Sequence, residues 1–276
     1  MKVTLHGVRG STPAPGREFV RVGGHTSCVS VTLKGATSPT LVLDAGTGLT
    51  KVSTTLYGKA FQGEIILSHL HWDHVHGLPF FTAGDTADAD VVLHLPAQDG
   101  ARSADPVSAA RLLGRAMSPP HFPIGPGGLA GRWRFRAADT GRFDAGGARV
   151  RLTEIPHKGG RTFGIRVEAD GESFAYLPDH APSVDSGPGT DLARGVDVLL
   201  HDAQFAESER DVAAAYGHAT VGDAVAAAER ARAGRLVLIH HAPGRTDDQI
   251  YALAEREAAN ARIPVAVGRE GDVLVL

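Results

Sequence analysis

The sequence predicts an α/β protein whose sheets are covered by helices on their outer faces. Two observations lead to this class. Much of the chain is a series of short runs with the period-two alternation of half-buried strands, separated by glycine-rich turns. In the last third, continuous apolar runs typical of buried strands alternate with stretches typical of helices. Buried strands need apolar cover, so the helices are expected to pack on the sheets.

The expected elements follow one another in chain order. Strands are predicted at residues 3–7, 28–33, 40–46, 64–69, 89–95, 132–137, 148–155, 162–169, 172–179, 196–202 and 235–241. Helices are predicted at 48–59, 208–216, 221–233 and 246–261, the third with Thr220 as its N-cap. A hairpin turn is predicted at Asp170-Gly171, and the Pro- and Gly-rich segment 118–131 is expected to be a loop. No composition break or repeat divides the chain, so residues 1–276 are predicted to form a single domain.

Composition and charge argue against several classes of protein. No apolar run approaches the roughly 20 residues that span a bilayer, and the N-terminal MKVTLHGVRG lacks the features of a secretory signal. We therefore expect a cytoplasmic protein with no membrane partner. The net charge of −3 provides no basic field for long nucleic acids. The single cysteine, Cys28, is expected to be a small buried apolar residue rather than a nucleophile or a ligand.

Histidine is the most informative residue type in this chain. The stretch SHLHWDH directly follows a short apolar run and contains His69, His71, Asp73 and His74. These residues are expected on the loop at the carboxyl end of a strand, where α/β folds tend to hold ligands. Imidazole nitrogen and carboxylate oxygen suit Zn²⁺ and similar divalent metals. The pattern HxHxDH arises by chance in only roughly 0.002 of chains of this length and composition.

Three further candidate ligands lie at the ends of other predicted strands. They are His157, Asp179 and His240. Together with the four residues of the loop they make seven potential ligands, which is enough for two metal ions. Imidazole and carboxylate accept Zn²⁺, Mn²⁺ and Fe²⁺, so two divalent ions, zinc or manganese in the first place, are the expected cofactors.

Five segments resemble, in order and spacing, the motifs of the metallo-β-lactamase superfamily. They are LDAGTGL at 43–49, SHLHWDH at 68–74, IPHKGG at 155–160, YLPDH at 176–180 and LVLIHHAP at 236–243. The resemblance covers nearly the whole chain. It implies an αββα sandwich, in which two mixed sheets are flanked by helices and a dinuclear metal site lies along one edge of the sheets.

The resemblance also implies how the ligands divide. One metal would be held by His69, His71 and His157, the other by Asp73, His74 and His240, with Asp179 bridging the two and Asp44 holding the ligand loop from behind. His241 adjoins the last of these ligands, and strand alternation would send the two histidines to opposite faces. We choose His240 because the family's last ligand lies at that distance before the proline, here Pro243.

Two more segments indicate one branch of the superfamily. LLHDAQF at 199–205 and YGHAT at 216–220 resemble the paired motifs of the phosphodiesterase branch, which includes tRNase Z and the phosphoribosyl cyclic phosphate phosphodiesterases. In that branch the acidic residue matching Asp202 orients the histidine matching His218 beside the leaving group. Phosphodiester hydrolysis requires such a pair, because it expels an alkoxide that must be protonated. Thioester hydrolysis expels a thiolate, which needs no acid.

Stand-alone bacterial proteins of this branch provide the closest resemblance. The shared segments are GSTP (10–13), GGHTSC (23–28), HWDHVHGLPFF (71–81), MSPPHFP (117–123) and HKGG (157–160). In this chain His25 replaces the usual Asn and Lys158 the usual Pro, and the roles of these two residues stay open, as does that of His241. Arg9 and Arg161 are candidate substrate-binding residues that would contact a phosphate.

These observations predict a hydrolase of small or cyclic phosphodiesters, such as a cyclic nucleotide or a cyclic sugar phosphate. Asp73, Asp202 and His218 are the predicted catalytic residues. Hydroxide shared by the metals would attack phosphorus, and His218, backed by Asp202, would protonate the departing oxygen. The small-molecule diester is the expected partner, and the resemblance suggests a homodimer.

Three alternatives stay open. The first is a tRNA 3′-processing endoribonuclease, although only 21 residues separate His157 from Asp179, where tRNase Z carries its tRNA-gripping arm. The second is a lactonase or thioesterase that uses the same metals. The third is a metal-dependent binding protein without turnover, which a missing ligand would indicate, and no ligand is missing.

Overall fold

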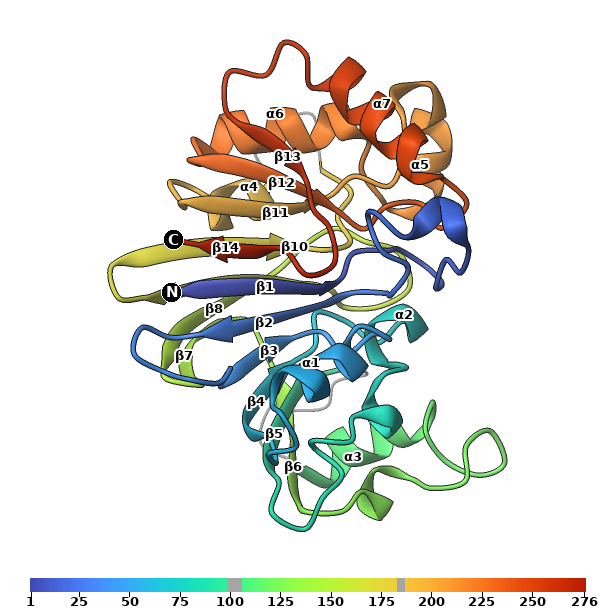
Figure 1. Ribbon diagram of the computed structural model, residues 1–276, viewed down its shortest axis with the longest axis vertical. Coiled ribbons are helices and arrows are strands. Elements are labelled where there is room, and N and C mark those ends of the chain that lie inside the picture. Colours follow the sequence, from blue (N-terminus) through green and yellow to red (C-terminus); the bar gives the residue numbers. More distant parts are fainter. Residues whose placement is uncertain (99–105, 183–186) are drawn as a thin grey trace.

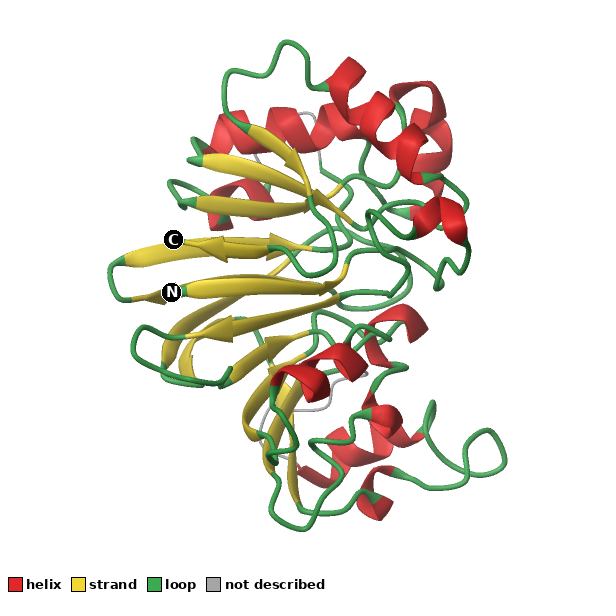
Figure 2. Cartoon of the chain, viewed as in Figure 1, coloured by secondary structure: helices red, strands yellow, loops and turns green. Residues whose placement is uncertain are grey.

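The computed structural model describes residues 1–98, 106–182 and 187–276. Two seven-stranded sheets pack against each other, and helices lie on the outer side of each sheet (Figure 1, Figure 2). The layers run helix, sheet, sheet, helix, so the predicted αββα sandwich is confirmed. Within the described residues, no helix is both long and apolar enough to cross a membrane.

The two sheets divide the strands between them. In spatial order the first sheet contains β14 (Val273–Val275), β1 (Lys2–Gly7), β2 (Cys28–Thr32), β3 (Leu41–Leu43), β4 (Gln62–Ile66), β5 (Asp90–Pro96) and β6 (Arg132–Ala138). The second contains β13 (Val265–Val267), β12 (Arg235–Ile239), β11 (Val198–Asp202), β10 (Glu172–Leu177), β9 (Phe163–Ala169), β8 (Ala148–Glu154) and β7 (Gly141–Ala145).

Both sheets are mixed. In the first, β3 to β6 are parallel neighbours, while β14, β1, β2 and β3 pair antiparallel. In the second, β10 to β13 are parallel and β7 to β10 antiparallel. Each sheet therefore has a block of parallel strands whose carboxyl ends share one edge.

Short helices accompany these blocks. They are α1 (Leu49–Thr55), α2 (Trp72–Val75), α3 (Pro106–Gly114), α4 (Pro188–Leu192), α5 (Arg210–Tyr216), α6 (Val221–Ala231) and α7 (Asp247–Glu257), with 3₁₀ turns η1 (Arg17–Phe19), η2 (Leu78–Phe80), η3 (Pro126–Gly128) and η4 (Glu207–Glu209). Thr220 caps α6, because its side chain accepts a hydrogen bond from the Asp223 amide, as predicted.

Three apolar clusters hold the layers together, one at each interface. Strand β3 shows how the sequence builds them. Leu41 and Leu43 belong to the cluster between the sheets, whereas Val42 belongs to the cluster beneath α1 and α3. A strand buried on both faces is apolar throughout rather than alternating, which explains the run LVL. Cys28 is buried in the second of these clusters, as expected for a small apolar residue.

Most predicted elements are confirmed to within a few residues. The hairpin of β9 and β10 turns at Asp170 and Gly171, which both have positive φ, as the Asp-Gly signal predicted. The segment 118–131 is a loop apart from the turn η3. The elements without a prediction are mostly short, namely α2, α3, α4, β7, β13 and β14. A three-residue strand such as β13 is too short to show a period in sequence.

Candidate active site

The loop that follows β4 is held from behind by Asp44. Its Oδ1 accepts a hydrogen bond from the Ser68 amide at 2.6 Å. Its Oδ2 accepts from the Ser68 hydroxyl at 2.8 Å, from His74 Nδ1 at 2.7 Å and from the Tyr176 hydroxyl at 2.9 Å. Asp44 is fully buried and has a φ of 59°, so the end of β3 turns sharply to place this carboxylate. The structure therefore places Asp44 where the sequence expects it, behind the ligand loop.

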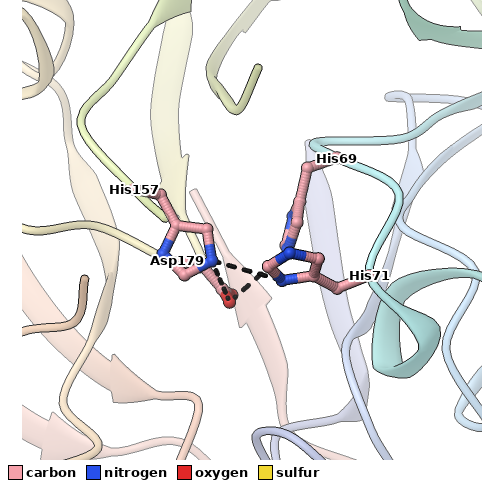
Figure 3. A group of neighbouring side chains, drawn as sticks. All are labelled: His69, His71, His157 and Asp179. Atoms are coloured by element: carbon pink, nitrogen blue, oxygen red, sulfur yellow. Dashed lines mark hydrogen bonds and ion pairs between the residues drawn. The ribbon is translucent and has the colours of Figure 1, made fainter. Parts of the chain in front are cut away.

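One group of candidate ligands gathers in front of this loop. His69, His71, His157 and Asp179 each offer a ligand atom, and these atoms all lie within 4.8 Å of one another. Figure 3 shows the three imidazoles turned toward the Asp179 carboxylate. His69 Nε2 lies 3.6 Å and His157 Nε2 3.5 Å from Asp179 Oδ2, and His157 Nε2 lies 3.3 Å from His71 Nδ1.

A second group lies beside the first and shares one residue with it. Asp73, His74, His240 and Asp179 also bring their ligand atoms within 4.8 Å of one another, and all four residues are buried. Asp179 Oδ1 lies 3.0 Å from His74 Nε2 and 3.1 Å from His240 Nε2. Asp73 Oδ2 lies 3.3 Å and 3.2 Å from the same two nitrogens. The two oxygens of Asp179 thus face different groups, which is the arrangement a bridging carboxylate needs.

The donor atoms of the first group are in a chemical state that suits a divalent metal. Burial lowers the pKa of His69, His71 and His157, so their imidazoles are neutral and carry a lone pair. His157 Nδ1 donates to the Gly217 carbonyl at 2.7 Å, which leaves Nε2 unprotonated toward the group. Burial opposes the charge of Asp179, yet the surrounding imidazoles hold its pKa well below the ordinary value.

Unsatisfied atoms support the same reading. Within the described residues, His69 Nε2 is buried without a hydrogen-bond partner, and His74 Nε2 and Asp179 Oδ1 lie 3.0 Å apart without a hydrogen bond of good geometry. Such atoms are costly unless something else binds them. A metal ion in each group would satisfy all three, so the seven residues fit a pair of divalent ions.

Asp202 and His218 form a second functional unit. His218 Nδ1 donates to Asp202 Oδ2 at 2.8 Å. The amides of His180 and Ala219 donate to the same oxygen, and the Gln204 amide donates to Oδ1. Burial lowers the pKa of His218, but the Asp202 carboxylate more than offsets this and raises the pKa to about 9. The pair is therefore an imidazole fixed by a carboxylate, as predicted.

This pair lies against both ligand groups. The His218 ring stacks on His240 with centroids 5.1 Å apart and meets the His157 ring edge-on at 4.9 Å. Ligand atoms of Asp202, His218 and His240 also lie within 4.8 Å of one another. These three residues could therefore hold a metal ion themselves. Such an ion is an alternative to the expected role of His218 as an acid.

The placement of His240 agrees with the sequence expectation, although the reasoning from strand alternation was wrong. Strand β12 ends at Ile239, and His240 follows with a φ of 57°, so the two histidines are not consecutive strand residues. His241 Nε2 donates to the Gly268 carbonyl, away from the ligand groups, and burial lowers the pKa of His241 to about 3.

Arg9 does not lie where a substrate could reach it, so the expectation of a phosphate contact is wrong. Its side chain is 0% exposed and pairs with Asp247 at 2.9 Å. It also donates to the carbonyls of Gly23 and Arg245, both at 2.7 Å. The guanidinium therefore joins three separate segments of the chain, which is a structural role.

Arg161 lies at a pocket beside the first ligand group. The pocket has a volume of about 330 Å³ and is lined by His69, Leu70, His71, Gln98, Leu112, Arg115, Gly159, Gly160, Arg161 and Thr162. The Arg161 guanidinium pairs with Asp139 and Glu154, whose side chains are half exposed. Arg161 therefore lines the pocket with its charge already partly neutralised.

The two residues that depart from the related proteins shape loops. The His25 ring lies 3.1 Å from a Glu270 carboxylate oxygen. Lys158 Nζ donates to the Ala215 carbonyl at 3.0 Å and lies over the Tyr216 ring, so it ties the loop after β8 to α5. Among the described residues, neither side chain forms a hydrogen bond or an ion pair with the ligand groups.

Tyr176 contacts the carboxylate that supports the ligand loop, and it was not predicted from the sequence. Its hydroxyl is one of the donors to Asp44. The available signal was a tyrosine inside the otherwise apolar run FAYL, because a buried tyrosine hydroxyl nearly always has a polar partner. The identity of the partner could not be read, since 132 positions separate the two residues.

Sequence comparisons agree with this geometry. The family model described as Beta-lactamase superfamily domain matches residues 41–241. Ribonuclease Z of Natronomonas pharaonis is 26% identical over an alignment of 309 residues that covers 95% of this chain and 92% of that protein.

Comparison with solved structures supports the fold alone. The metallo-beta-lactamase fold protein YhfI from Bacillus subtilis has a TM-score of 0.70 at 18% identity, with 99% of this chain and 98% of that chain covered. A structure described as a new diphosphatase from the PhnP family has a TM-score of 0.69 at 17% identity, with 100% and 97% covered.

Proposed function

Because the chain belongs to the β-lactamase superfamily and is a metal-dependent hydrolase, we propose that it cleaves phosphodiester bonds in small or cyclic substrates. The observation that carries this proposal is the Asp202–His218 pair beside the ligand groups. A protonated imidazole held by a carboxylate is what an alkoxide leaving group requires. A thioesterase has no use for it, since a thiolate leaves without a proton.

We propose that two divalent ions, zinc or manganese, occupy the two ligand groups. The residues that would hold them are His69, His71 and His157 for one ion and Asp73, His74 and His240 for the other, with Asp179 between them. When bound, the ions supply Lewis acidity that lowers the pKa of water to about 7 and neutralises charge on the diester. The chain contributes five imidazoles, two carboxylates and, through Asp44, a fixed orientation of His74.

His218 is the proposed general acid. Its Nδ1 is committed to Asp202, so the proton available for transfer is the one on Nε2. Asp202 accepts the His218 hydrogen bond and backbone amide hydrogen bonds at once, which fixes the direction of the carboxylate. This geometry keeps the imidazole in one orientation while the leaving oxygen takes the proton.

Two observations favour a small substrate. Residues 163–177 form a single hairpin that turns directly at Asp170 and Gly171, so no projecting arm lies between His157 and Asp179. The pocket beside His69 and His71 has a volume of about 330 Å³, which is near the lower end for small-molecule sites.

An RNA 3′ end is the second candidate substrate. The relative named Ribonuclease Z aligns along 95% of this chain, and this similarity supports an RNA substrate about as well as the geometry supports a small one. A lactonase or thioesterase with the same metals is the third candidate. The presence of all seven candidate ligands argues against a binding protein without turnover.

A substrate panel on metal-loaded protein separates these candidates. The panel contains bis(p-nitrophenyl) phosphate, a 2′,3′-cyclic nucleotide, a cyclic sugar phosphate, a precursor tRNA, a thioester and a lactone. We expect the highest kcat/KM on a cyclic or small diester. A higher value on precursor tRNA would replace the first proposal by the second, and turnover of only the thioester or lactone would reject both.

Three further expectations accompany the proposal. The chain is proposed to act as one domain, as a homodimer and in the cytoplasm. The first rests on the continuous pattern of elements in the sequence, and the second on the resemblance to the phosphodiesterase branch. The third rests on the composition.

A further inference from the structure

The segment GSTP near the N-terminus lies directly on the candidate active site. A Cβ atom on Gly10 would lie 2.5 Å from two atoms of the His240 ring, so the backbone of Gly10 packs on this imidazole. The next residue, Ser11, donates its amide hydrogen to Asp73 Oδ2 at 2.7 Å. Ser11 is exposed to solvent, whereas Asp73 and His240 are buried. The serine side chain therefore stands at the open side of the second ligand group.

Gln204 holds this serine from the other side. Its backbone amide donates to Asp202 Oδ1 at 3.0 Å, and its side-chain Nε2 donates to Ser11 Oγ at 3.1 Å. The Gln204 side chain is buried, with 6% of the residue exposed, so its position is fixed by packing as well as by hydrogen bonds. A continuous chain of contacts thus runs from the general-acid pair through Gln204 and Ser11 to Asp73.

The contact with Gln204 leaves the Ser11 hydroxyl free to donate. A hydroxyl has one hydrogen and two lone pairs, and Gln204 uses one of the lone pairs. Among the residues that the structure describes, no acceptor for the Ser11 hydroxyl hydrogen is found. The hydrogen is therefore available to a ligand that enters beside Asp73.

The backbone of Ser11 makes a side chain at this position unexpected. Its φ is 62°, in the left-handed region that glycine adopts with much less strain. The amide that binds Asp73 would be present in a glycine too. The serine side chain therefore calls for a role of its own, and among the described residues its hydroxyl forms one hydrogen bond, with Gln204.

We propose that Ser11 is a substrate-binding residue whose hydroxyl donates a hydrogen bond to a non-bridging oxygen of the phosphoryl group, and that Gln204 is the positioning residue that aims it. The inference rests on the proposed phosphodiesterase function. The metal ligands and the general acid give no role to the exposed residue Ser11. The proposal gives Ser11 the role of recognising the phosphate.

The test compares Ser11→Ala and Gln204→Ala, singly and together, with Thr12→Ala as a matched control that removes the neighbouring exposed hydroxyl. Three quantities are measured: bound metal, kcat/KM on the best diester, and the Kd of inorganic phosphate by calorimetry. Ser11→Ala keeps the Cβ atom and the amide bonded to Asp73, so we expect bound metal to stay unchanged. The kcat/KM should fall roughly tenfold to hundredfold, the range for a hydrogen bond to a charged group, and phosphate should bind more weakly.

Gln204 acts only through Ser11 in this proposal, so the double variant should be no worse than Ser11→Ala alone. Multiplicative losses would overturn the positioning role. A change of less than about twofold in both kcat/KM and phosphate Kd for Ser11→Ala would overturn the binding role, as would equal losses in Thr12→Ala. If the wild type cleaves no phosphodiester, the proposed function fails, and the phosphate Kd still decides the role of Ser11 separately.

Discussion

Replacing His218 by Ala tests the general-acid role through the leaving group. The variant removes the imidazole that donates to Asp202 at 2.8 Å and stacks on His240, but none of the seven candidate ligands. General acid catalysis contributes about 10²- to 10⁴-fold, equivalent to about 3–5 kcal/mol of barrier. We expect a loss of this size on a diester with an alkyl leaving group. On bis(p-nitrophenyl) phosphate, whose leaving group departs as a stable phenolate, the loss should stay within about tenfold.

The assay is kcat/KM for both diesters on the same metal-loaded preparations, with bound metal and thermal unfolding measured in parallel. His121→Ala is the control, because His121 is an exposed histidine in the loop 118–131. Equal losses on both diesters in the His218 variant would refute the acid role. A parallel loss of bound metal would instead indicate the rival position between Asp202, His218 and His240.

Three further predictions follow from the same structure. Asp44→Asn should weaken metal binding by about 10- to 100-fold, since Asp44 accepts the His74 hydrogen bond, and titration with a metal indicator measures this. Removal of metal by a chelator should lower the unfolding temperature by several degrees, because an ion that binds only the folded chain at 100 times Kd stabilises it by about 2.7 kcal/mol; an unchanged temperature would contradict the dinuclear site. Burial lowers the pKa of His6 to about 4, against an ordinary value of 6.5. Between these two pH values His6 is protonated in the unfolded chain and neutral in the folded chain. The contribution of His6 to the free energy of unfolding is therefore complete above about pH 6.5 and is lost as the pH falls towards 4. Denaturant unfolding should show a loss of about 2 kcal/mol between pH 7 and pH 5 from this residue, and His6→Gln should reduce the pH dependence by that amount.

The candidate ligands could be predicted from the sequence because the fold places them by a simple rule. His69 follows β4, Asp179 follows β10 and His240 follows β12. Each of these strands belongs to a parallel block, and parallel strands bring their carboxyl ends to one edge of the sheet. The position of these residues at strand ends therefore predicted that they lie at one edge, whereas the division of the ligands between two ions came from the resemblance to the metallo-β-lactamase superfamily.

Contacts made by loops did not follow such a rule. Arg9 pairs with Asp247, which lies 238 positions further along the chain, and Ser11 meets Gln204 across 193 positions. The residue types do not indicate that these loops meet. The sequence does not distinguish a buried arginine from an exposed one, or an exposed serine from a buried one. The sequence therefore left Arg9 as a candidate for substrate and left Ser11 without a role.

Local backbone conformation was the other feature beyond sequence reasoning. The predicted strand 235–241 ends two residues early because His240 adopts a positive φ, which is uncommon for any residue except glycine. Asp44 does the same after β3. Both residues turn out of a sheet at the site, where the surrounding contacts hold them in this conformation.

The central claim is that the seven candidate ligands bind two metal ions. Anomalous scattering from a crystal of the metal-loaded protein tests it most directly, because it locates the ions. We expect two ions, one among His69, His71 and His157 and the other among Asp73, His74 and His240, with the two oxygens of Asp179 each facing one ion. A single ion, or an ion between Asp202 and His218 in place of one of these two, would contradict it.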